Sequence, residues 1–128
     1  KVKFEHVSFP LDLAALNAEK ILKCGENSQT NFKFLTEIYQ KQNKWTVGTD
    51  INIINSSIKS IGKKFSLTEA AMNKCLNDKN LEEKILNERI EAQKNYKISS
   101  TPTVYINEKK YEGKRDYKSF KKAIEKLL

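Results

Sequence analysis

The 128-residue sequence has no long apolar run and is poor in several residue types that active sites often use. No stretch approaches the ~20 apolar residues of a membrane helix, so an integral membrane protein is not expected. His6 is the single histidine, and no pattern of partners accompanies it for a metal site or a catalytic dyad. Gly-rich phosphate loops, EF-hand spacing and zinc quartets are missing too. The sequence therefore predicts no metal and no cofactor.

Arginine is also scarce. The sequence has 24 Lys and Arg residues against 16 Asp and Glu, a net charge of +8, but only Arg89 and Arg115 are arginine. Base readout and bidentate phosphate recognition both favour arginine over lysine. The basic residues of segment 107–128 are interleaved with acidic ones, which is typical of a solvated surface. We therefore expect no nucleic-acid partner, and contact of segment 109–126 with an anionic surface is the weaker alternative.

The length and the 38% of hydrophobic residues fit one globular domain with a core of ordinary size. Apolar residues recur along the whole chain, which argues against a disordered protein. The sequence begins with Lys1 rather than Met and has no apolar signal-peptide core. We therefore expect a processed product or a piece of a longer chain.

The spacing of apolar residues changes twice along the chain. Val2–Pro10 alternates as a short strand does, and helical spacing then runs from Asp12 to about Tyr96. After Ser99, residues 103–106 are β-branched or aromatic, and Lys110-Tyr111 can form the returning strand of a hairpin. A final helix with an apolar stripe follows, and Asp116 is its expected N-cap.

The helical zone contains several helices. Asp50 is a plausible N-cap for the clearest of them, whose isoleucines at 51, 54, 58 and 61 share one face and which Gly62 can end. Ser66 or Thr68 can begin the next helix. Trp45, the single tryptophan, is expected on a loop between helices, where it would pack. A lone early strand and a late hairpin, separated by these helices, indicate a helical insertion in an α/β domain.

The late hairpin resembles a known fold. Thr101-Pro102-Thr103-Val104-Tyr105-Ile106-Asn107, with a helix before it and a turn, a glycine and a helix after it, resembles the C-terminal half of a thioredoxin-fold domain. The rest of the chain resembles the DsbA-like thiol-disulfide oxidoreductases through segment 2–12, Ala14, Ala18, Gln42, Trp45, Gly62 and Cys75-Leu76. The resemblance covers 2–128 and implies an α/β, thioredoxin-like fold of DsbA type. Segments 1–10 and 98–128 would form the thioredoxin-like part, and 11–97 an inserted all-helical domain.

The chain lacks the motif that carries the redox reaction in this family. DsbA-like enzymes carry Cys-x-x-Cys at the start of a helix that precedes the segment resembling Val2–Pro10, because exchange needs a low-pKa thiolate with a second cysteine beside it. This sequence has no Cys-x-x-Cys, so no catalytic residue is expected in it. By the family layout, the N-terminal strand and the active-site helix are absent. That strand would lie in the middle of the sheet, so we expect another chain or segment to supply it, unless the remaining strands pair directly.

Cys24 and Cys75 lie far apart, each within an apolar helical pattern, and could be two unpaired buried thiols. Some relatives carry a second, non-catalytic disulfide in the helical insertion, and the resemblance implies that Cys24 and Cys75 form it. Such a bond would close a loop of about 50 residues and stabilise the fold by about 4 kcal/mol.

Base rates favour a trans bond before Pro102, because only about 5–6% of X–Pro bonds are cis. The resemblance implies the opposite. In thioredoxin-fold oxidoreductases the proline at this position is cis and faces the catalytic cysteines, and the residue before it presents backbone groups to an extended substrate peptide. Thr101 and Pro102 are therefore the expected substrate-binding residues, with Thr101 also tuning the redox potential.

The resemblance thus implies a thiol-disulfide oxidoreductase of the bacterial periplasm or cell envelope. Its partners would be unfolded or reduced secreted proteins and a membrane redox partner. A redox-inactive thioredoxin-like module that binds peptides at Thr101-Pro102 is the alternative. As written, the chain is expected to be inactive in exchange.

Overall fold

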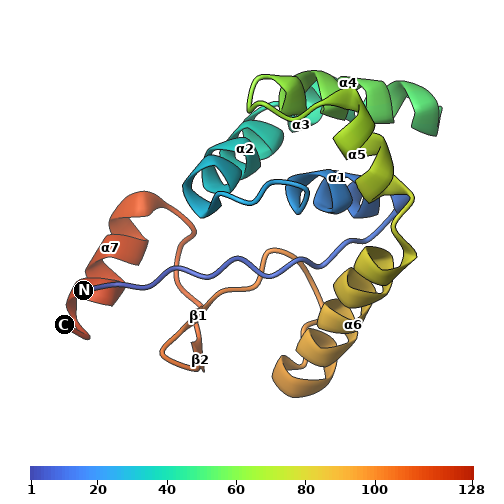
Figure 1. Ribbon diagram of the computed structural model, residues 1–128. Helices are drawn as coiled ribbons and strands as arrows, with labels where there is room; N and C mark the ends of the chain where they lie inside the picture. The colour runs from blue at the N-terminus through green and yellow to red at the C-terminus, as the bar shows by residue number, and fades with distance from the viewer. The chain divides into compact units, whose positions relative to one another are not determined.

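A computed structural model describes residues 1–128 and contains seven helices and one short hairpin (Figure 1). The helices are α1 (Leu13–Leu22), α2 (Ser28–Gln40), α3 (Gln42–Trp45), α4 (Ile51–Lys63), α5 (Glu69–Leu76), α6 (Lys79–Tyr96) and α7 (Tyr117–Glu125). The hairpin strands are β1 (Tyr105–Ile106) and β2 (Lys109–Lys110). None of the helices combines the length and the apolar character needed to cross a membrane.

The chain forms two compact units. The larger unit comprises Val7–Glu91, and the smaller one comprises Lys1–His6 together with Ala92–Leu128. These boundaries differ by a few residues from the predicted helical insertion, 11–97, and thioredoxin-like part, 1–10 and 98–128. Helix α6 passes from the larger unit into the smaller one.

The core of the larger unit is built from one face of each helix from α1 to α5. Helices α1, α2, α3 and α5 all contact α4, and α1 also contacts α2 and α5. The buried side chains that form this core are Ala18, Ile21, Leu22, Phe34, Ile38, Trp45, Ile54, Ile58, Ile61 and Met72. The isoleucine spacing of α4 therefore predicts the observed buried face correctly.

Side-chain caps fix where the helices begin. Asp50 accepts a hydrogen bond from the Asn52 amide at 2.9 Å at the start of α4, and Asp116 accepts one from the Ser119 amide at 2.8 Å at the start of α7. Thr68, rather than Ser66, caps α5. Each cap satisfies an amide that has no partner within the helix. The predicted caps at positions 50 and 116 are confirmed.

Two details of the helical zone differ from expectation. Trp45 ends the short helix α3 instead of lying on a loop, and its indole N–H donates to the Ile38 carbonyl at 2.8 Å. Helix α4 continues one residue past Gly62. A Cβ at Gly62 would lie 2.7 Å from Met72 Sδ, so glycine at this position allows α4 and α5 to pack closely and does not end the helix.

The smaller unit has little regular structure. Strands β1 and β2 pair antiparallel through a two-residue turn at Asn107 and Glu108, which both have positive φ, as a type I′ hairpin requires. The predicted strand at Val2–Pro10 is wrong, because no segment pairs with it and a strand is stabilised by its ladder of hydrogen bonds. The three predicted strands therefore do not form one sheet. Helix α7 has no fully buried residue, although Phe120 packs on Tyr111 with ring centroids 4.6 Å apart.

The α4 face offers a matched pair of substitutions. Ile58 is fully buried, whereas Ile53 on the same helix is 61% exposed. Ile58→Ala is expected to lower the free energy of unfolding by about 2–5 kcal/mol, since it leaves a cavity, and Ile53→Ala by less than about 0.5 kcal/mol. Urea unfolding followed by circular dichroism measures both. Equal losses for the two variants would contradict this description of the core.

Candidate functional site

The segment 97–104 leads from the end of α6 to strand β1 and contains the two predicted substrate-binding residues. Thr101 and Pro102 are exposed, and the peptide bond between them is cis. The N–H, the C=O and the hydroxyl of Thr101 make no hydrogen bond within the chain. These three polar groups are therefore available to a partner, next to a proline that has no N–H to donate.

Both sides of this exposed segment are held in place. The Thr103 hydroxyl donates a hydrogen bond to the Ser100 carbonyl, with 2.5 Å between the two oxygen atoms. The Tyr105 hydroxyl donates to the Tyr96 carbonyl at 2.8 Å, and the two tyrosine rings meet edge to face with centroids 4.9 Å apart. The Thr101 backbone is thus presented between fixed points, which lowers the entropy cost of binding an extended peptide.

The smaller unit also has an open pocket of about 430 Å³. Its lining consists of Asn95, Tyr96, Lys97, Tyr105 and Glu108. The two rings supply apolar surface, while the lysine and the glutamate supply one charge of each sign. The lining therefore combines apolar surface with charges of both signs.

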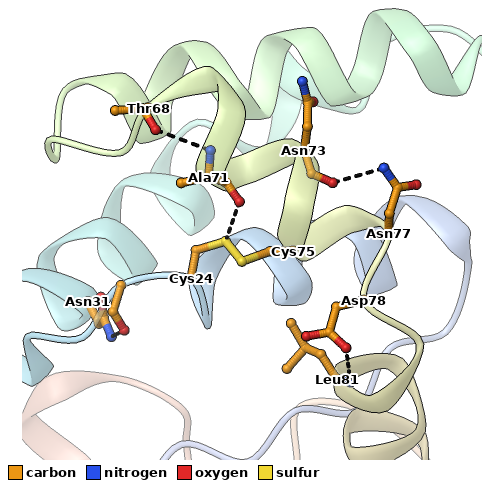
Figure 2. Close-up of a disulfide and its surroundings, with 10 residues drawn as sticks. Cys24, Asn31, Thr68, Ala71, Asn73, Cys75, Asn77, Asp78 and Leu81 are labelled. Carbon is orange, nitrogen blue, oxygen red and sulfur yellow. Dashed lines mark hydrogen bonds between the residues drawn. A yellow bond between two sulfur atoms is a disulfide. The ribbon is translucent and has the colours of Figure 1, made fainter.

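Cys24 and Cys75 form a disulfide, with Cα atoms 6.0 Å apart and a sequence separation of 51 (Figure 2). Cys75 lies in α5, as expected from its helical pattern, but Cys24 follows the end of α1 and is not inside a helix. The sulfur of Cys24 is 3.5 Å from the Ala71 carbonyl oxygen. Because both cysteines are bonded, the chain has no free thiol that could act as a nucleophile.

A buried lysine reinforces the same region. Lys20 on α1 is 4% exposed, and its Nζ is 2.9 Å from Glu82 Oε2 and 3.3 Å from the Leu76 carbonyl oxygen. Hydrogen bonding to Lys20 lowers the pKa of Glu82, and the charges of Lys20 and Lys79 act in the same direction. Our sequence analysis missed this ion pair. The sequence feature that could have predicted the pair is Lys20 itself, because this lysine directly precedes Ile21 and lies on the apolar face of α1.

The other singled-out residues do not join a site. His6 is exposed, and Trp45 belongs to the core. No group of three or more His, Cys, Asp or Glu side chains is arranged to hold a metal ion. The unpaired polar groups of Thr101 and the disulfide belong to different units of the chain.

The disulfide is expected to stabilise the larger unit. For 51 residues the chain-entropy relation gives about 4 kcal/mol, so adding a reductant is expected to lower the free energy of unfolding by about 2–4 kcal/mol. The double variant Cys24→Ala with Cys75→Ala is the control and should not respond to the reductant. Alkylation of both thiols before reduction would contradict the bond.

The comparisons with known proteins agree with this geometry. A family model described as Thioredoxin matches residues 1–126. The crystal structure of Wolbachia pipientis alpha-DsbA1 is similar, with a TM-score of 0.79 and 28% identity over 93% of this chain and 64% of that one. A threonine-to-valine variant and a double cysteine-to-alanine variant of that protein match with TM-scores of 0.79 and 27% identity.

No curated protein sequence matches the chain. The chain spans 64% of the length of the Wolbachia structures that it matches. The family model covers nearly all of its residues, and the arrangement of a small hairpin with a helical insertion is that of the DsbA type. The chain belongs to the thioredoxin family and has a DsbA-like thioredoxin fold.

Proposed function

We propose that this protein is part of a DsbA-like thiol-disulfide oxidoreductase that acts on unfolded or reduced secreted proteins in the bacterial periplasm or cell envelope. The observation that carries the proposal is the exposed Thr101, whose backbone groups are unpaired, in a chain that belongs to the thioredoxin family. In this assignment Thr101 and Pro102 lie against the substrate main chain, and the N–H and C=O of Thr101 can bind peptides of different sequence, because every peptide carries matching main-chain groups.

The chemistry assigned to the intact enzyme is an exchange of two electrons. A substrate thiolate attacks a Cys-x-x-Cys disulfide to form a mixed disulfide, and a second substrate thiolate displaces the enzyme thiol. The substrate gains a disulfide, and the enzyme becomes a dithiol that a membrane redox partner reoxidises. The 128 residues contain no Cys-x-x-Cys, so their own part in this reaction is to bind and orient the peptide.

The smaller unit also supports the proposal that a further strand joins it. Strands β1 and β2 have two residues each, and segment 2–6 has no strand partner. Val2 is 59% exposed and Leu127 is 57% exposed. An added strand, from another chain or another segment, would pair with unpaired backbone and cover such apolar side chains.

A redox-inactive, thioredoxin-like peptide-binding module is the second candidate. It is favoured by one observation: the chain contains no Cys-x-x-Cys, and both of its cysteines are joined in one disulfide. Such a module would use the same Thr101 groups and hold peptides without exchanging electrons. The two candidates therefore share a binding site and differ only in chemistry.

Peptide binding can be tested with a substitution at the proposed site. Thr101→Glu is expected to weaken binding of a reduced, unfolded peptide about tenfold or more, because it places a larger charged side chain at the proposed contact. Thr49→Glu is the control, since Thr49 is also an exposed loop threonine but lies in the larger unit. Isothermal titration calorimetry measures both variants. Equal affinities of the two variants for the peptide would show that the peptide does not bind at Thr101.

Electron transfer separates the two candidates. The complete gene product is expected to oxidise a reduced dithiol peptide through a Cys-x-x-Cys disulfide, while the 128-residue chain, whose one disulfide is the structural Cys24–Cys75 bond, leaves the peptide reduced. Mass spectrometry of the alkylated peptide measures the fraction oxidised. Peptide binding by the complete product without oxidation would support the redox-inactive module.

A further inference from the structure

The chain passes between its two units at two places, which are far apart in sequence. The first crossing lies between His6 and Val7, and the second between Glu91 and Ala92. Local opening of the chain at either crossing depends on the contacts of the residues next to it.

Arg89 joins the two segments. Its Nη1 donates a hydrogen bond to the Pro10 carbonyl, and its Cζ lies 4.9 Å from the centroid of the Phe9 ring. Arg89 precedes the second crossing by two residues, and Phe9 and Pro10 follow the first crossing closely. One guanidinium thus makes two different contacts with a segment 79 residues away, and all three residues belong to the larger unit.

Each segment is also fixed to the larger unit by itself. Ser8 is 2% exposed, and its hydroxyl donates to Glu19 Oε2 on α1 at 2.5 Å. On α6, Glu82 pairs with Lys20, and Ile85 is fully buried. Residues 82, 85 and 89 follow a spacing of 3 and 4 and so lie on one face of α6. Arg89 is the last of these anchors before the helix enters the smaller unit.

We propose that Arg89 is a clamp that holds the two connecting segments together and so restricts local opening at the crossings. The Pro10 carbonyl is buried and has no other hydrogen bond, so removing the guanidinium would leave it unsatisfied. Arginine suits this position because its planar group can donate a hydrogen bond and stack on a ring at the same time, which an ammonium cannot do equally well. This inference does not depend on the proposed redox function.

Hydrogen exchange of the full chain, measured by mass spectrometry, tests the clamp. Arg89→Gln is expected to raise the exchange rate of the hydrogen-bonded amides in the last turns of α6, residues 90–96, about tenfold, and to leave α1 and α4 unchanged. Arg115→Gln is the matched control: it removes the same charge from the only other arginine, which is exposed and makes no ion pair. It should leave exchange in residues 90–96 unchanged.

Phe9→Leu provides a second test, because it removes the contact between Arg89 and the Phe9 ring and keeps the Pro10 carbonyl as a hydrogen-bond acceptor. It is expected to raise exchange in residues 90–96 by a smaller factor, and it keeps the clamp testable if Arg89→Gln does not fold. Unchanged exchange in residues 90–96 would overturn the proposal. Equal increases in α1, α4 and residues 90–96 would overturn it too, since they would show global destabilisation instead of local opening.

Discussion

The packing of α1 against α4 and α5 is the interaction on which the larger unit depends. This ten-residue helix contributes Ile21, which is fully buried, to the core. The same helix carries the buried Lys20 to its partner on α6, and the chain directly after it carries Cys24 to α5. Apolar burial, an ion pair and a disulfide thus act on one short segment. Displacing α1 would disturb all three contacts together, so the larger unit is expected to unfold cooperatively.

The two units have different physical characters. The larger one has a closed apolar core and a covalent cross-link, whereas the smaller one has two very short strands and a helix, α7, with no fully buried residue. The groups suited to peptide binding, at Thr101, belong to the less regular unit. Unpaired backbone is costly when it is buried but useful when a partner can pair with it. The proposed peptide site thus lies in the unit with less regular structure.

Sequence reasoning succeeded where the relevant forces are local. The Asp50 cap and the isoleucine spacing of α4 predicted a helix and its buried face, because capping and periodicity act within a few residues. It failed at Val2–Pro10, whose alternating pattern predicts a strand although no partner strand is present to pair with it. It also misassigned Gly62, whose role comes from the approach of Met72, a residue of another helix. The residue pattern within one segment does not show which other segment of the chain packs or pairs with it.

The sequence by itself determined the helix caps at Asp50 and Asp116, the hairpin and the thioredoxin resemblance, because these depend on neighbouring residues or on a continuous motif. Only the tertiary structure decided that Lys20 is buried beside Glu82 and that Arg89 reaches Pro10. Charged side chains are normally solvated, and burial is tolerated only where a partner compensates for lost hydration. Such partners come from segments more than sixty residues away, and the folding of the chain, rather than local sequence, brings them together.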